Sequence, residues 1–202
     1  MTRTLLTLTC MFYLLNSTFS QTVMNERDSL KAYYSKKNKI TNDGMYVLGG
    51  WATLNLVMGI IGSVNSEGTH QYFYQMNAFW GGVNLLISYT SLRALHKTAN
   101  DPVFIGYAEL DQRKTEKIFL INAGLDVLYI GAGFGLIDWS GSRGVNEQRI
   151  EGYGQSFVVQ GAFLLGFDLI MYYLHKRNKK QRLNPLLKGL EFNGVGLTYR
   201  FD

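Results

Sequence analysis

Long uncharged stretches alternate with short charged segments along most of the chain. Four stretches hold at most one Asp, Glu, Lys or Arg each: 44–66, 68–92, 118–137 and 152–174. Each has about 20 residues or more, enough for a helix to cross a hydrocarbon layer of about 30 Å. A soluble four-helix bundle is the alternative. A soluble helix of that length would, however, carry charge on its outer face. The pattern predicts four transmembrane helices, at about 44–66, 73–95, 117–138 and 156–175.

The first twenty residues have the pattern of a secretory signal. Arg3 precedes an apolar run over residues 5–15, and the small residues Thr18 and Ser20 follow it. This order is typical of a signal peptide cleaved after Ser20, and the run is short for a membrane span. We predict a signal peptide at 1–20, with an uncleaved anchor as the alternative, followed by a basic N-terminal segment at 21–43.

The end of the chain has a turn signal. Asn193-Gly194 separates residues 188–192 from an alternating segment at 195–201. Asn-Gly between such segments is a strong signal for a β-hairpin. The predicted fold class is therefore an all-α membrane protein, an up-down bundle of four transmembrane helices at 44–175 after a signal peptide. A basic tail at 176–202 with a short C-terminal β-hairpin completes it.

Each uncharged stretch carries Asn or Asp near its centre. Those residues are Asn55, Asn84, Asp126 and Asp168. Each follows a similar pair of residues, a small one and then an apolar one, which suggests a repeated helical unit. In an up-down bundle all four would meet in one polar layer near the bilayer midplane. Further polar residues fall on the same helix faces and support this layer: Asn77, Asn122 and Gln160.

Two interpretations of this layer stand side by side. Ionisable residues inside a membrane are by default a functional hypothesis, here a site for a proton, a cation or a small polar ligand. In low dielectric, Asp126 or Asp168 would be protonated, or the pair would share a proton. The other interpretation is hydrogen bonding between helices, at about 0.6–2 kcal/mol per contact. Packing is the expected role of the Asn residues, whereas Asp126 and Asp168 leave both roles open.

Small residues at a spacing of four accompany the polar ones. They allow helix backbones to approach closely. The predicted packing pairs are Ala78/Gly82, Gly131/Gly135 and Ala162/Gly166. The glycines of 131–135 lack the strand and the Lys-Ser/Thr of a phosphate-binding loop, so packing is the better interpretation.

Composition excludes several classes of protein. The single Cys10 rules out a disulfide scaffold and a cysteine zinc site, and the three widely spaced histidines disfavour a histidine metal site. No nucleophile and base pair suggests a hydrolase. We therefore expect no enzyme activity, no cofactor and no bound metal.

The basic residues favour one orientation. Residues 21–43, 93–117 and 176–202 each hold five or more Lys or Arg, whereas 65–72 holds none and 138–155 holds two. The positive-inside rule then places both termini and the middle connection in the cytoplasm, which conflicts with a cleaved signal. We expect a multi-pass protein of a bacterial inner membrane, with the outer membrane as the alternative.

Residues 44–175 resemble a known group of proteins. The resemblance is carried by Trp51-x-x-x-Asn55 and by Met76-Asn77-x-x-Trp80-Gly81-Gly82-x-Asn84. These motifs are similar to those of a family of small predicted multi-pass membrane proteins of Bacteroidetes-type bacteria. That family has no assigned activity, so the resemblance implies a topology and a bacterial origin and no function.

Two functions are compatible with these features. The short connections and the lack of a catalytic pattern favour an accessory or structural subunit of a bacterial envelope complex. The alternative is a small transporter or an ion- or proton-binding bundle that uses the midplane polar layer. The expected partners are the lipid bilayer and other membrane proteins or further copies of the chain. Nucleic acid is not expected, because the basic tail adjoins a membrane helix.

Overall fold

The computed structural model describes the backbone of residues 2–98, 105–141, 146–188, 190–192 and 197–199, and the side chains of 27–96, 105–141 and 146–188. Four long helices dominate it: α1 (Thr2–Asn65), α2 (Gly68–Thr98), α3 (Ile105–Ser140) and α4 (Glu147–Asn178). A π-helical turn, η2 (Lys179–Leu183), and the short α5 (Asn184–Lys188) continue α4. Long helices are the expected result for apolar segments, because a helix satisfies its backbone polar groups internally.

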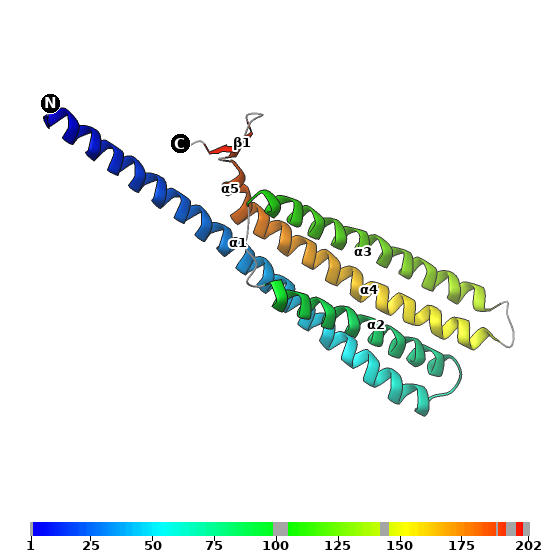
Figure 1. The fold of residues 1–202 in the computed structure, drawn as a ribbon. Helices are drawn as coiled ribbons and strands as arrows, with labels where there is room; N and C mark the ends of the chain where they lie inside the picture. Colours follow the sequence, from blue (N-terminus) through cyan, green and yellow to red (C-terminus); the bar gives the residue numbers. More distant parts are fainter. Residues whose placement is uncertain (1, 99–104, 142–145, 189, 193–196, 200–202) are drawn as a thin grey trace.

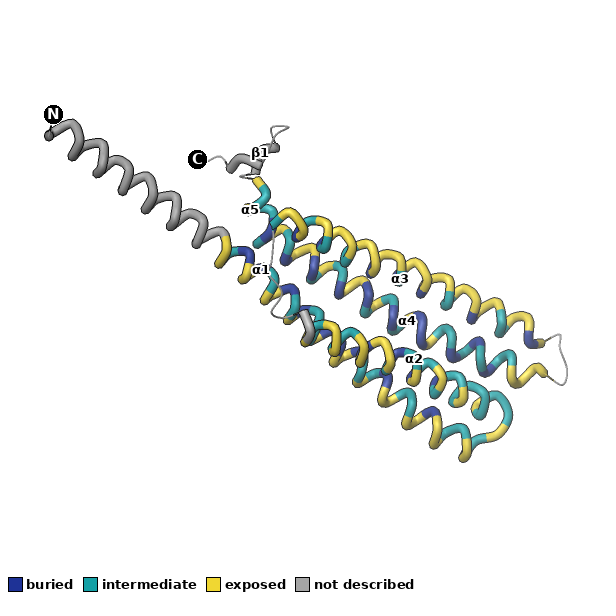
Figure 2. The backbone as a smooth tube through the Cα atoms, viewed as in Figure 1, coloured by how far each residue is buried: buried dark blue, intermediate teal, exposed yellow. Residues whose placement is uncertain are grey.

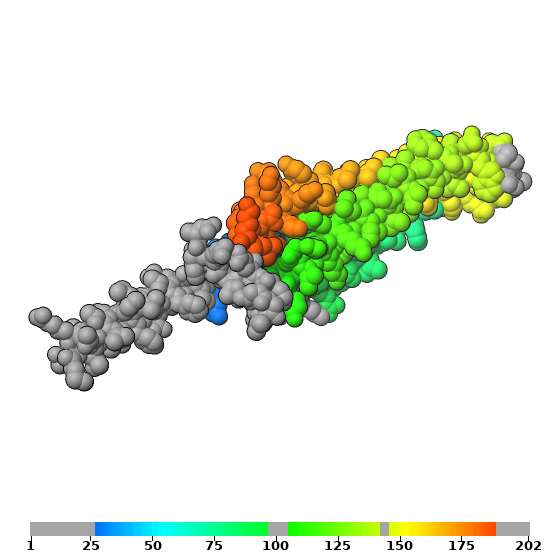
Figure 3. Space-filling view, turned by 90° about the horizontal axis from the view of Figure 1, so that it is seen from above, coloured from blue at the N-terminus to red at the C-terminus, as the bar shows by residue number. Residues whose placement is uncertain are grey.

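The helices form two antiparallel hairpins, α1–α2 and α3–α4 (Figure 1). Gly68, with a φ of 62°, allows the sharp reversal between α1 and α2. The helix α4 packs against α2 and α1 as well as α3, whereas α3 packs chiefly on α4. Figure 3 shows α3 and α4 side by side along one face. We call the end of the bundle where α2 ends and α3 begins the basic end.

Burial in this bundle runs opposite to that of a soluble protein. Large apolar side chains are exposed on all four helices, among them Leu54, Leu86 and Leu128 at 63%, 63% and 66%. Buried positions include many polar side chains, especially along α4, while α3 is exposed on its outer side (Figure 2). An apolar exterior of this extent indicates that lipid covers it. The described helices therefore indicate a membrane protein.

The predicted count of four membrane-spanning helices is wrong. Among the described residues, three helices are long and apolar enough to cross a membrane: Arg27–Asn65, Ile105–Ser140 and Glu147–Lys188. The helix α2 is not one of them. Its uncharged stretch includes Gln75, Asn77 and Asn84, so the absence of charge there did not mean an apolar helix. The fold class is corrected to a helical bundle with three candidate spans.

The two ends of the chain also differ from the prediction. The backbone of α1 runs without a break through residues 20 and 43, the predicted ends of the signal peptide and of the basic segment. Cleavage after Ser20 stays a prediction. At the other end β1 (Leu190–Phe192) pairs with β2 (Leu197–Tyr199) in antiparallel register, so both strands are shorter than the predicted hairpin arms. The turn predicted at 193–194 lies outside the described residues.

Glycines bring the helices together, but not the glycines of the predicted pairs; of those pairs Ala78 does lie at a close approach, 2.5 Å from its backbone nitrogen to a Cβ built on Gly59. A Cβ on Gly81 would lie 2.5 Å from the backbone nitrogen of Leu56 on α1. A Cβ on Gly133 of α3 or on Gly154 of α4 would lie 2.7 Å from the carbonyl oxygen of the other. A Cβ would meet no atom within 4 Å at the predicted packing glycines Gly82, Gly131, Gly135 and Gly166. The offset arises because one residue turns a helix face by about 100°.

Candidate functional site

Two polar groups lie inside the bundle at different depths. The first, the Gln160 network, joins α1, α2 and α4. Gln160 Nε2 donates to Asn55 Oδ1 at 2.7 Å and to Asn77 Oδ1 at 2.8 Å, and Gln160 Oε1 accepts from Trp51 Nε1 at 3.0 Å. Ser156 Oγ donates to Asn77 Oδ1 at 2.9 Å. These hydrogen bonds match donors with acceptors, as expected of residues that hold helices together.

The second group is centred on Asp126 of α3 and Asp168 of α4. They are 3% and 5% exposed, and their carboxyl groups lie within hydrogen-bonding reach of each other. The side chain of Asn122 lies near Asp168. Asp168 is eight residues from Gln160 along α4, so its backbone lies about 12 Å closer to the basic end than that of Gln160.

Three buried polar atoms around the carboxyl pair have no hydrogen-bond partner among the described residues. They are Trp80 Nε1, Asn84 Nδ2 and Asp126 Oδ2. The ring of Trp80 packs against Tyr129 of α3, with centroids 5.1 Å apart. Because α2 and α3 run in opposite directions, Asn84 and Asp126 both lie about one turn from this contact, towards the basic end. An Asn amide within reach of a carboxylate would pair with it, so the two helices are apart at this level.

A cleft of about 1760 Å³ occupies this space between α2 and α3. It is lined from the basic end by Arg27 and Lys31 and extends to Tyr129, and all four helices contribute to its wall. The carboxyl pair, Trp80, Asn84 and Asn122 belong to this wall. The cleft is larger than a typical small-molecule site of about 300–1,000 Å³.

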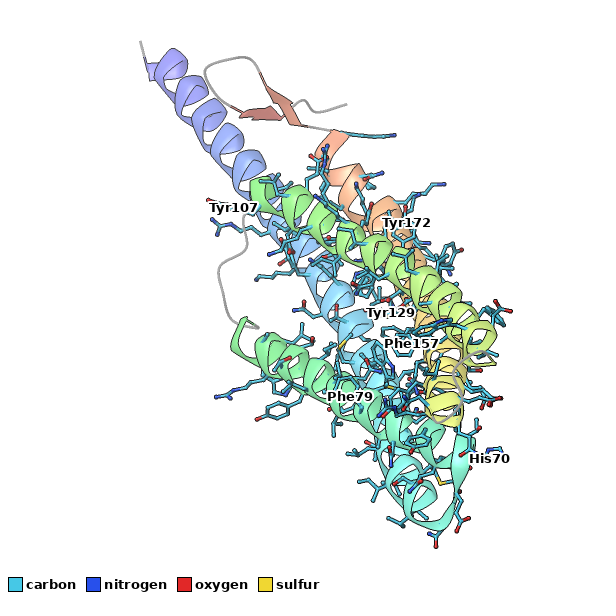
Figure 4. The ribbon with its side chains drawn as sticks, turned by 90° about the vertical axis from the view of Figure 1, so that its right-hand side faces the viewer. His70, Phe79, Tyr107, Tyr129, Phe157 and Tyr172 are labelled. Atoms are coloured by element: carbon cyan, nitrogen blue, oxygen red, sulfur yellow. The ribbon has the colours of Figure 1, made fainter. Side chains whose placement is uncertain are left out.

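Three aromatic rings close the deep end of the cleft. Trp80, Tyr129 and Phe157 come from α2, α3 and α4 and pack edge to face, with centroids 5.1, 5.8 and 6.0 Å apart. Figure 4 shows Tyr129 and Phe157 next to each other. We call these three residues the aromatic cluster. It lies at a similar depth to the Gln160 network, because Gln160 falls between Asp168 and Phe157 along α4.

The basic end of the cleft is held by contacts between α1 and α3. Lys37, only 7% exposed, forms an ion pair with Asp111. Tyr33 Oη donates to Gln112 Oε1 at 2.6 Å, and Gln112 Nε2 donates to the carbonyl oxygen of His175 at 3.2 Å. An isolated buried cation would be costly, so Asp111 stabilises the buried position of Lys37.

Several of these buried residues were not predicted. Gln112 and His175 are fully buried, and a repeat of seven residues would have found both. Gln112 lies two sevens before Asp126, and His175 lies seven after Asp168. Residues seven apart share a helix face.

The structure places the predicted site residues in both groups. Asn84, Asn122, Asp126 and Asp168 line the cleft together. Asn55, Asn77 and Gln160 instead form the Gln160 network. At the level of the carboxyl pair the cleft receives apolar residues from α1, Met45 and Leu48, rather than Asn55.

These features define a class of protein, a helical bundle with three candidate membrane spans and a buried polar cleft. The chain belongs to DUF6992, a family of unknown function, which matches residues 47–169. The match confirms the expected relation to a family without an assigned activity, and it covers both the carboxyl pair and the Gln160 network. Comparisons with functionally characterised proteins and with solved structures found no match.

Proposed function

We propose that this protein is a multi-pass protein of a bacterial membrane that binds a proton or a small cation at the carboxyl pair, as a small transporter or ion-binding bundle. The observation that carries the proposal is the unsatisfied polar group at Asn84 and Asp126, buried in the wall of the cleft. Buried polar atoms without partners cost free energy, so a ligand or water that satisfies them is the expected occupant.

The contrast with the Gln160 network supports this proposal. Where the chain joins helices with polar residues, the donors have acceptors. Around Asp126 and Asp168 they do not, and two carboxyl groups replace the amides that would serve packing more cheaply. Two carboxyl groups held close together away from water are able to share one proton, so the pair is suited to hold a proton.

A second candidate is an accessory subunit of an envelope complex. It is favoured by the polarity of α2 and by the open side of the cleft between α2 and α3. A helix from a partner protein or from a second copy would cover both. Under this role the carboxyl pair contributes to packing, and its replacement by amides leaves function intact.

Infrared spectroscopy of the purified protein in lipid tests whether the carboxyl pair holds a proton. We expect a C=O band of a protonated carboxylic acid that titrates with pH in the native protein. Asp126→Asn and Asp168→Asn should each shift the frequency and the pH midpoint of this band, because each removes one of the two groups that share the proton. The control is Asp138→Asn, at an exposed position of α3, which should keep the band unchanged.

The same variants separate the two candidates. In sealed vesicles that enclose a pH-sensitive dye, a proton carrier should lose flux in Asp126→Asn while its helix content stays unchanged. A native protein whose band is absent, or unshifted in all three variants, would contradict proton binding at this pair. The accessory-subunit role would then be the better explanation.

A further inference from the structure

The cleft reaches the carboxyl pair from one end of the bundle. Its wall begins at Arg27 and Lys31 and ends at Tyr129. Asp126 lies nine residues beyond Lys117, the last charged residue before it on α3. The carboxyl pair is therefore about 13 Å below the charged rim, near the middle of a hydrocarbon layer of about 30 Å.

Polar side chains follow the cleft down α3. Asp111, Thr115, Asn122 and Asp126 all belong to its wall. Their spacings of 4, 7 and 4 residues keep them within about 60° of one another around the helix axis. Against lipid tails alone such a stripe would be unfavourable, because each polar group would lose its hydration at a cost in free energy. The stripe indicates that water enters the cleft.

Two groups at a similar depth close the opposite end of the cleft. The aromatic cluster fills the space between α2, α3 and α4 beyond the carboxyl pair. Beside it the Gln160 network joins α1, α2 and α4, and further on Gly133 and Gly154 bring the backbones of α3 and α4 together. The wall of this cleft includes no residue beyond Tyr129 on α3 and none before Trp80 on α2.

We infer that the cleft is a hydrated half-channel through which protons reach the carboxyl pair from the basic end alone. This inference rests on the proposed function. Water is both donor and acceptor, so a chain of waters in the cleft can bring protons to the carboxyl pair, beside which Asn84 Nδ2 and Asp126 Oδ2 have no protein partner. Water-filled cavities around intramembrane carboxyl groups are the usual setting of proton relays.

The charges at the mouth favour protons over metal cations. Arg27, Lys31 and Lys37 line it, and the only acidic residue in this part of the cleft wall is Asp111. A positive rim repels cations that must arrive as whole charges. A proton instead passes along a chain of hydrogen-bonded water molecules.

Thiol labelling in sealed vesicles tests the half-channel. The background variant is Cys10→Ser, which removes the only native cysteine. Into it we would introduce Thr115→Cys and Asn122→Cys, both in the cleft wall, and as a matched control Leu120→Cys, which lies at similar depth with a 48% exposed side chain facing outwards. The probe is a charged thiol reagent that does not cross membranes.

Two cysteine variants at exposed positions report which end of the bundle the reagent reaches. Lys180→Cys reports the basic end and Glu147→Cys the opposite end. We expect Thr115→Cys and Asn122→Cys to react only from the basic end, about tenfold faster than Leu120→Cys or more, because only a hydrated thiol ionises and reacts.

Either of two results would overturn the half-channel. Equal rates at Asn122→Cys and Leu120→Cys would show that the cleft is dry or filled with lipid. Reaction of Asn122→Cys from the opposite end would show that access is not one-sided. Labelling reports water access and the infrared band reports proton binding, so the two proposals fail independently.

Discussion

At the scale of single residues, hydrogen-bond satisfaction separates the two polar groups. Gln160 makes three hydrogen bonds to three side chains on two other helices. Asn84 is equally buried, at 3%, yet its Nδ2 has no partner. Burial and residue type are alike at the two positions, so neither distinguishes a packing residue from a candidate site residue. The partners do.

This difference predicts that two similar substitutions change the free energy of unfolding by different amounts. Gln160→Leu should lower the free energy of unfolding by about 2–4 kcal/mol, because three polar side chains lose their partner. Asn84→Leu should change it by about 1 kcal/mol or less in either direction, because the amide it removes is unsatisfied. Unfolding by denaturing detergent in mixed micelles measures both.

The two variants should also differ in function. Asn84→Leu is expected to reduce proton flux without loss of folded protein, which is the usual trade-off at functional sites. If Asn84→Leu destabilised the protein as much as Gln160→Leu, Asn84 would have a packing role and the candidate site would lose one of its polar groups.

At the scale of elements, each helix shows one narrow face to its neighbours. The buried residues of α3 include five that are seven apart: Gln112, Phe119, Asp126, Gly133 and Ser140. This face pairs with α4, where Gly154, Gly161, Asp168 and His175 have the same spacing and are also buried. The carboxyl pair and the close glycine contacts therefore belong to one interface.

Substitutions at two neighbouring glycines of α2 test how narrow the face is that α2 packs against α1. Gly81→Ala should destabilise the protein by about 1–3 kcal/mol, because the new Cβ meets the backbone of α1. Gly82→Ala is the matched control and should stabilise it by up to about 1 kcal/mol, because Ala favours helix and the position is open. Detergent unfolding gives both values, and equal effects would contradict the packing of α2 on α1.

At the scale of the whole molecule, the basic segments gather at one end. Leu30 of α1, Ala108 of α3 and Leu183 of η2 form one buried cluster there. Residues 27–39, 109–117 and 176–182, which hold many of the Lys and Arg residues, surround it. A bundle with one strongly basic end is what the positive-inside rule expects when that end faces the cytoplasm.

Cell fractionation and the mass of the N-terminus test this orientation. We expect the protein in the inner membrane with its basic end in the cytoplasm, as the positive-inside rule requires. A retained Met1 would then show that residues 1–20 stay as an uncleaved anchor, the alternative to the predicted cleavage after Ser20. The variants Lys180→Cys and Glu147→Cys should react on opposite sides of the membrane. A mature start at Gln21 together with recovery in the outer membrane would reverse the assignment, with the basic end facing the periplasm.

The sequence by itself determined the helices and their long uncharged segments. Helix formation in an apolar segment depends on local backbone hydrogen bonds, which composition predicts well. It also indicated that Asp126 and Asp168 are unusual, since a charge in an uncharged stretch is visible without any contact. The four-span count did not hold, because α2 is uncharged but rich in amides and hydroxyls.

Only the tertiary structure decided which polar residues meet. Asn55 and Asn84 are alike in sequence, yet one joins the Gln160 network and the other lines the cleft. Which of the two groups each residue joins depends on how far its helix is shifted along its neighbours and how it is rotated about its axis. Packing sets both quantities, and a rotation by one residue moves a side chain about 100° around the helix. The same dependence explains why Gly81 packs on α1 while Gly82 does not.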